Sequence, residues 1–265
     1  MYRALRAVTQ FRRVAEIPQV CHATPDWRCL LSAYVDLWPA RFPFSIRLAT
    51  GPFEFREPSD VPTFWQVFFA QIYQVAPADR LIIDAGANIG AFTLYALLHA
   101  PHAHVVAIEP APDTAERLRA AVQAHGIADR CTILQAALAA EAGTTTIQLS
   151  PNSQVRVTGR GGVSVPTVTL DGLIATYGSV DLLKLDIEGA EYEALPVASA
   201  ATLRRIQRIE MEYHPDGDPE VLFRLLAQQG FAVRLESDKS CEAGYGMARL
   251  TRVEQPGAVI EKEAA

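Results

Sequence analysis

The segment Leu81–Gly90, LIIDAGANIG, constrains the fold more than any other part of this 265-residue chain. Three apolar residues followed by Asp84 are typical of a short buried strand. Gly86 and Gly90 let the backbone turn tightly and approach a ligand without a Cβ atom in the way. Residues 91–98 continue as an apolar run of helix-forming residues, so we expect the glycines at a strand-to-helix turn. In a doubly wound α/β sheet, such a turn binds a nucleotide-like ligand.

The spacing within this turn indicates which ligand it suits. It is Asp-x-Gly-x-Asn-x-Gly, whereas dinucleotide-binding folds use Gly-x-Gly-x-x-Gly to admit a pyrophosphate at a helix N-terminus. An acid before the first glycine repels a phosphate and suits a cation. S-adenosylmethionine carries an ammonium and a sulfonium group and no phosphate. The turn therefore predicts S-adenosylmethionine, with a nicotinamide dinucleotide and its oxidoreductase chemistry as the alternative.

Strands and helices alternate along the chain from residue 81 onward. The apolar patterns predict strands at 81–84, 104–109, 131–135, 181–187, 206–213 and 231–235, and helices at 90–99, 112–125, 189–203 and 218–229. This alternation predicts a mainly parallel sheet with right-handed crossovers and helices on both faces. Residues 247–253 predict an antiparallel seventh strand. Residues 144–149 and 163–170 predict a β-hairpin at the rim of the sheet.

The residues before this α/β region predict an N-terminal extension with helices at 2–14 and 26–37 and a hairpin within 41–55. A helix over 61–75 carries an aromatic stripe that indicates core packing, with a cover over the ligand as the alternative: Phe64, Trp65, Phe68, Phe69 and Tyr73. We divide the chain into an extension at 1–58, a cofactor-binding domain at 59–253 and a flexible tail at 254–265. The N-terminal helices suit either a homodimer interface or a lid.

Net charge and composition limit which classes of partner and which cellular location we expect for the chain. The net charge of −6 and pI of about 5.5 disfavour a nucleic-acid partner, because no basic excess neutralises phosphates. The chain has no apolar run of the roughly 18 residues that a membrane span requires, and its start lacks the apolar core of a signal peptide. The four cysteines are scattered and form no C-x-x-C pair, so we expect reduced thiols in a cytoplasmic protein.

Charged residues end three further predicted strands. Glu109 closes the second strand, 25 residues after Asp84, where an acid accepts hydrogen bonds from ribose hydroxyls. Asp186 and Glu188 end the strand at 181–187, where open α/β sheets bind ligands. Lys184 lies on the same face of this predicted strand as the two acids. Opposite charges at such short separation either form a structural ion pair or shift each other's pKa.

The strand at 206–213 ends in a second acidic pattern, Glu210-Met-Glu212-Tyr-His214. Glu212 and His214 alternate onto one face, and histidine is well suited to accept a proton near neutral pH. A purely structural role for His214 is the alternative. With Asp186, these two residues are the catalytic candidates.

Together these stretches resemble the FkbM family of S-adenosylmethionine-dependent methyltransferases. The resemblance covers roughly residues 55–235 and rests on LIIDAGANIG (81–90), VVAIEP (105–110), VPTVTLD (165–171), LLKLDIEGAE (182–191) and RIEMEYH (208–214). It implies a Rossmann-like class I methyltransferase fold with a seven-stranded sheet. The N-terminal 50 residues carry no match to this family.

The resemblance also implies a set of cofactor contacts. The methionine part of S-adenosylmethionine would be lined by Asp84, Gly86, Asn88 and Gly90, with Ala87 and Thr93 as further contacts. Glu109 would hold the ribose and Pro110 would shape the adjoining turn. The adenine would lie beside Gln135, Ala136 and Ala137, and Asp186 would stand between cofactor and acceptor.

The reaction implied is O-methylation of a hydroxyl on a small natural product or sugar. Methylation of an Asn side-chain amide in a peptide or protein is the alternative, and a binding protein without turnover is a third reading that the intact motifs disfavour. We expect Asp186, Glu212 and His214 to surround the acceptor, with His214 or Asp186 as general base. We expect no resident metal; a variant mechanism has Asp186 and Glu212 hold Mg²⁺.

Overall fold

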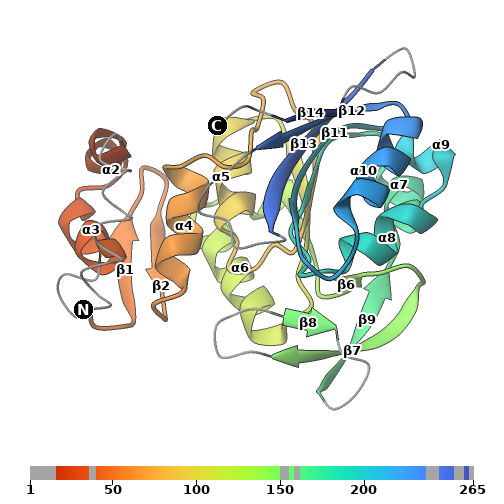
Figure 1. Ribbon diagram of the computed structural model, residues 1–265. Helices are drawn as coiled ribbons and strands as arrows, with labels where there is room; N and C mark the ends of the chain where they lie inside the picture. Colours follow the sequence, from red (N-terminus) through yellow and green to blue (C-terminus); the bar gives the residue numbers. More distant parts are fainter. Residues whose placement is uncertain are drawn as a thin grey trace.

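The computed structural model describes residues 16–35, 40–149, 155–157, 162–236, 245–253 and 260–262. An eight-stranded sheet forms its centre (Figure 1). In spatial order its strands are β14 (Ile260–Lys262), β12 (Phe231–Glu236), β13 (Gly246–Arg252), β11 (Ile206–Tyr213), β10 (Val180–Leu185), β3 (Leu81–Ala85), β4 (His104–Ile108) and β5 (Cys131–Leu134). β13 runs antiparallel to both of its neighbours, and the other adjacent pairs are parallel.

The predicted α/β class and the seven predicted strands are confirmed, with boundaries shifted by one or two residues. The eighth strand, β14, lies in the segment expected to be a flexible tail and pairs with β12 through Val233 and Ile260. The order of β3, β4 and β5 on one side and β10 and β11 on the other places a reversal of strand order between β3 and β10. Ligands of open α/β sheets bind outside the carboxyl ends of the strands at such a switch point.

Alternate residues of the central strands face two separate cores, because successive side chains of a strand point to opposite faces. Ile82, Val105 and Leu182 pack with α4 (Asp60–Phe68), α5 (Ala91–His99) and α6 (Pro112–Ala124). Ile83 and Leu183 pack with helices on the other face (Figure 1): α7 (Leu170–Tyr177), α8 (Glu191–Val197), α9 (Ala200–Leu203) and α10 (Pro219–Gln228).

The helices on this second face differ from the prediction in two places. The helix expected over 189–203 is split into α8 and α9, because Ala198 and Ser199 are extended and the Ser199 side chain caps α9 by accepting from the Thr202 N–H. The sequence patterns also missed α7, which Thr169 caps by accepting from the Gly172 N–H. A short 3-10 turn, η2 (Ala128–Arg130), precedes β5.

The predicted hairpin after β5 is present, but it belongs to a sheet of its own. β7 (Gly143–Leu149) pairs antiparallel with β9 (Val163–Val168) and with β8 (Val155–Val157). β6 (Ala137–Leu138) joins them by pairing parallel with β9. This small sheet brings Ala137 and Leu138 next to the carboxyl ends of the central strands.

The N-terminal extension packs on the α4 side of the domain. It contains α2 (Ile17–Ala23), α3 (Trp27–Val35) and an antiparallel hairpin of β1 (Phe44–Arg47) and β2 (Pro52–Phe55). The helix predicted over 2–14 lies outside the described residues, and α4 ends at Phe68, earlier than expected. The ring of the fully buried Phe64 lies 4.7, 5.3 and 4.2 Å from those of Phe53, Phe55 and Phe68. This cluster joins the hairpin to the domain.

We predict that Phe64→Ala lowers the free energy of unfolding by about 3–5 kcal/mol, because it leaves a cavity where the hairpin meets α4. Val221 on α10 is 57% exposed and supplies the control: Val221→Ala should change it by less than about 0.5 kcal/mol. Urea unfolding followed by circular dichroism measures both. Equal losses in the two variants would show that the cluster does not hold the extension in place.

Candidate functional site

The turn after β3 is held tightly between the ends of two neighbouring strands. Gly86, Asn88 and Gly90 have φ angles of +78°, +49° and +85°. The N–H groups of Gly86 and Ala87 both donate to the carbonyl of Ile108 at the end of β4, at 3.0 Å. A Cβ atom on Gly86 would lie 1.7 Å from the carbonyl oxygen of Asp186. Only glycine therefore fits at position 86.

Glu109 is fixed at the end of β4 by two backbone donors. Its Oε2 accepts from the Asn88 N–H and its Oε1 from the Ala111 N–H, both at 2.8 Å. The residue is 3% exposed. Burial raises the pKa of its carboxyl to about 7, against the lowering effect of the two N–H donors. The carboxyl is thus held in one orientation between the turn and α6.

Asp84 lies beneath the turn and is fully buried. Lys184 Nζ lies 3.3 Å from Asp84 Oδ1, and the Thr93 hydroxyl donates to Asp84 Oδ2 at 2.6 Å. Lys184 also donates to the Gly86 carbonyl at 2.7 Å and lies 3.8 Å from Asp186. Burial lowers the Lys184 pKa, but the charges of Asp84 and Asp186 outweigh this and raise it. The ion pair anticipated between Lys184 and Asp186 exists, with Asp84 as the nearer partner.

A cleft opens above this turn, at the carboxyl ends of β3, β4 and β10. Six of the residues expected to contact a cofactor line it: Gly86, Asn88, Glu109, Pro110, Ala137 and Asp186. Outside its lining lie Asp84, Ala87, Gly90, Thr93, Gln135 and Ala136. Five further residues complete it, namely Ile108, Leu138, Ile187, Glu188 and Ala190. Ile108, Leu138 and Ile187 are next to predicted site residues in sequence, and Glu188 and Ala190 belong to the same segment, 186–190, that follows β10.

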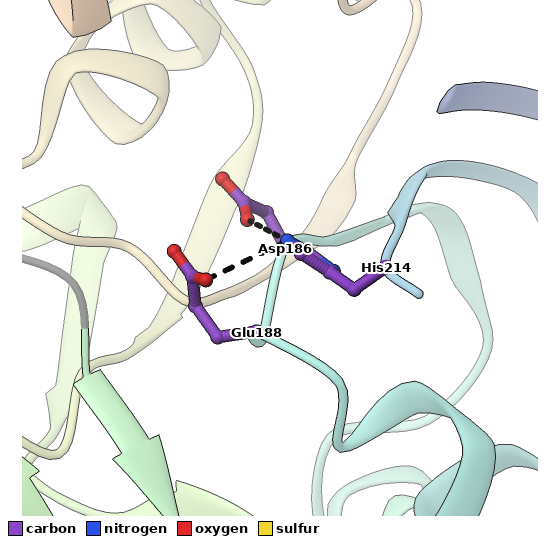
Figure 2. Close-up of side chains that lie close together, drawn as sticks. All are labelled: Asp186, Glu188 and His214. Carbon is purple, nitrogen blue, oxygen red and sulfur yellow. Dashed lines mark ion pairs between the residues drawn. The ribbon is translucent and has the colours of Figure 1, made fainter. Parts of the chain in front are cut away.

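Beside the cleft, Asp186, Glu188 and His214 converge from the ends of β10 and β11 (Figure 2). His214 Nε2 lies 3.9 Å from Asp186 Oδ1 and 3.7 Å from Glu188 Oε2. Behind the ring, the Glu191 carboxylate lies 3.0 Å from His214 Nδ1 and accepts from the His214 backbone N–H at 2.9 Å. Glu188 adopts a left-handed backbone conformation, with φ of +54°.

The charged groups of this cluster shift each other's pKa values, because most of them are buried and weakly screened by water. Burial disfavours protonated His214, but the hydrogen bond and charge of Glu191, with the charges of Asp186 and Glu188, raise its pKa to about 9. Burial, followed by the charge of Asp186, raises the pKa of Glu212 to about 7. The three predicted catalytic residues are therefore near one another, and Glu188 and Glu191 are charged neighbours that the prediction omitted.

The fold and the position of the cleft define a class of protein. A parallel sheet with one antiparallel strand, a cleft at the switch point and helices on both faces is the class I methyltransferase fold. The chain is similar to the crystal structure of methyltransferase FkbM from Methylobacillus flagellatus KT, with a TM-score of 0.51 at 12% identity. The match covers 92% of this chain and 60% of that one.

The family follows from the sequence. The model of the methyltransferase FkbM domain matches residues 84–233, and the chain belongs to this family. It is 30% identical over 203 residues to the 31-O-demethyl-FK506 methyltransferase FkbM of Streptomyces tacrolimicus, covering 62% of this chain and 77% of that protein. It is 29% identical over 164 residues to the hexuronic acid methyltransferase AglP of Haloferax volcanii, covering 59% and 65%.

A third relative is the methyltransferase sdnD of Sordaria araneosa, 28% identical over 208 residues, which are 63% of this chain and 80% of that protein.

Among the described residues, none of the helices combines the length and the apolar character needed to cross a membrane.

The crowding at Gly86 can be separated from the cost of its left-handed backbone. Gly126 also has a positive φ, +66°, but a Cβ there would meet nothing within 4 Å. Gly126→Ala should lower the free energy of unfolding by about 1–2 kcal/mol through backbone strain alone. Gly86→Ala should cost at least about 2 kcal/mol more, because the methyl group overlaps the Asp186 carbonyl. Urea unfolding compares the two, and equal costs would contradict the packing described.

The raised pKa of Glu109 makes stability depend on pH. The folded chain keeps the Glu109 proton up to about pH 7, whereas the ordinary pKa is 4.5. Between these values the folded state binds more protons, so the free energy of unfolding falls as pH rises. Glu109→Gln should reduce this fall by roughly 3 kcal/mol between pH 4.5 and 8. Urea unfolding across that range measures it; parallel profiles for variant and wild type would contradict the shift.

Proposed function

We propose that this protein transfers the methyl group of S-adenosylmethionine to a hydroxyl group of a small-molecule or sugar acceptor. The observation that carries the cofactor assignment is the chemistry of the cleft. Its lining has three acids, Glu109, Asp186 and Glu188, and no basic side chain among its described residues. Such a lining suits a ligand with ammonium and sulfonium charges and repels the pyrophosphate of a nicotinamide dinucleotide.

The residues of the cleft fit the parts of this cofactor. Each Glu109 oxygen accepts one backbone N–H and keeps a further lone pair, so the carboxylate can also accept from the two ribose hydroxyls. Ala137 and Leu138 offer a small apolar wall for the adenine. The turn at Gly86 and Asn88, beside Asp186, would receive the methionine part.

Bound S-adenosylmethionine would supply an electrophilic methyl group for the acceptor oxygen, and its sulfur would keep the electron pair of the carbon–sulfur bond. The chain must then orient the hydroxyl group and receive its proton. We assign this to Asp186, Glu212 and His214. Asp186, whose side chain is 31% exposed, faces the acceptor, while His214 is held behind it at 3.9 Å.

The names of two relatives support the acceptor class. One is a 31-O-demethyl-FK506 methyltransferase and another a hexuronic acid methyltransferase. Both names describe methylation of a small molecule or a sugar acid. Methylation of an Asn side chain in a peptide is the alternative that an acceptor screen must include.

Calorimetric titration with S-adenosylhomocysteine tests the cofactor assignment. At pH 8, where the Glu109 carboxyl is ionised, Glu109→Gln should weaken binding about 10–100-fold, because a hydrogen bond to a charged group contributes about 1.5–3 kcal/mol. Glu116→Gln, an exposed change on α6, should bind like wild type. If folded wild-type protein binds NAD and not S-adenosylhomocysteine, the proposal fails. Transfer of a labelled methyl group to hydroxylated small molecules and to Asn-containing peptides, side by side, then identifies the acceptor class.

A further inference from the structure

The cluster of Asp186, Glu188 and His214 has the composition and spacing of a metal site. The three side chains each offer one ligand atom, and these atoms all lie within 4.8 Å of one another. Ligand atoms bound about 2.0–2.2 Å from one ion lie roughly 3–4 Å apart. The distances of 3.7 and 3.9 Å from His214 Nε2 to the two carboxylates fall in that range.

His214 supplies an independent sign that the cluster holds a ligand. Its side chain is 3% exposed, and its Nε2 is aimed between the two carboxylates (Figure 2). This atom lies 3.9 and 3.7 Å from the two carboxylate oxygens, beyond hydrogen-bond distance of either. A histidine nitrogen aimed at two acids, at the separation that ligands of one ion have, suits an ion held between them.

Glu191 holds the His214 ring in the orientation and tautomer that a metal ligand needs. Its fully buried carboxylate lies against Nδ1 at 3.0 Å, and an ionised carboxylate can only accept, so Nδ1 carries the hydrogen. The Nε2 lone pair of the neutral ring then faces Asp186 and Glu188. A carboxylate that holds the second nitrogen of a metal-binding histidine fixes the ring and strengthens it as a ligand. The second oxygen of Glu191 is itself held by the Gly189 N–H at 3.0 Å.

The local charge also favours a cation. Among the described residues, Asp186, Glu188 and Glu191 surround His214, and the nearby cation Lys184 is committed to Asp84 and the Gly86 carbonyl. A proton on Nε2 supplies one positive charge, and a metal ion would displace it and supply two.

We propose that Asp186, Glu188 and His214 bind a divalent transition-metal ion, with Glu191 as the residue that orients His214. Mixed imidazole and carboxylate ligation favours Mn²⁺ or Zn²⁺ over Mg²⁺. This assignment departs from the expectation of a metal-free site, and it replaces Glu212 of the Mg²⁺ variant with Glu188 and His214. On the proposed function, on which this role rests, the open side of the ion would bind the acceptor oxygen beside the cofactor cleft.

Titration of the purified full chain with Mn²⁺, with free Mn²⁺ counted by electron paramagnetic resonance, tests the site directly. Neither cofactor nor acceptor is present, so the outcome is independent of methyl transfer, which the S-adenosylhomocysteine titration decides separately. We expect one Mn²⁺ per chain and markedly weaker binding of Mg²⁺. Glu188→Gln and His214→Gln should abolish the Mn²⁺ site, and Glu191→Gln should weaken it about 10–100-fold.

The matched control is Glu193→Gln, which removes an exposed acid from the same helix as Glu191 and should leave Mn²⁺ binding unchanged. Glu188 is 19% exposed, so its variant should fold even if the buried His214 variant does not; thermal unfolding of each checks this. Wild-type protein that binds no Mn²⁺ or Zn²⁺ would overturn the proposal and leave a proton as the cation. Equal binding by wild type and a folded Glu188→Gln variant would overturn it too.

Discussion

The buried ion pair between Lys184 and Asp84 is the interaction on which the site depends. Lys184 comes from β10 and Asp84 from β3, the two strands on either side of the switch point, and the same ammonium group holds the Gly86 carbonyl at 2.7 Å. A charge buried without its partner typically costs about 3–5 kcal/mol. This pair therefore fixes the turn after β3 relative to β10, which Asp186 follows. The two sides of the cleft formed by these segments are held at a fixed separation.

The acids around the cleft have different tasks because they differ in burial and in partners. Asp84 neutralises Lys184 below the turn, Glu109 is fixed by two backbone donors, and Asp186 and Glu188 face the open space beside His214. The result is a cleft with an acidic wall above a neutralised ion pair. Membership of the FkbM methyltransferase family accords with that arrangement, since a sulfonium ligand suits an acidic lining.

Much of this could be predicted from the sequence, because strand ends and glycine turns are local signals. The strands that carry Glu109, Asp186 and His214 were placed to within two residues, and parallel pairing then brings their ends together. Asp84, expected to contact the methionine part of the cofactor, lies outside the cleft lining, because Lys184 from β10 and Thr93 from α5 hold its carboxylate beneath the turn. Glu188 and Glu191 were also missed as neighbours of His214, because the left-handed backbone at Glu188 and the turn at Gly189 redirect the chain after β10. Helix α7 was missed although Thr169 gives it a local cap, whereas the small sheet depends on pairing between segments that are distant in sequence.

The central claim is that the cleft above Gly86 binds S-adenosylmethionine. Amide hydrogen exchange with and without S-adenosylhomocysteine, resolved by mass spectrometry, tests it most directly because it locates the ligand on the chain. The account predicts slower exchange in peptides that contain the turn at 85–91, the end of β4 through Ala111, and residues 186–190, with exchange in β1 and β2 unchanged. Protection confined to the N-terminal extension, or none at saturating ligand, would contradict it.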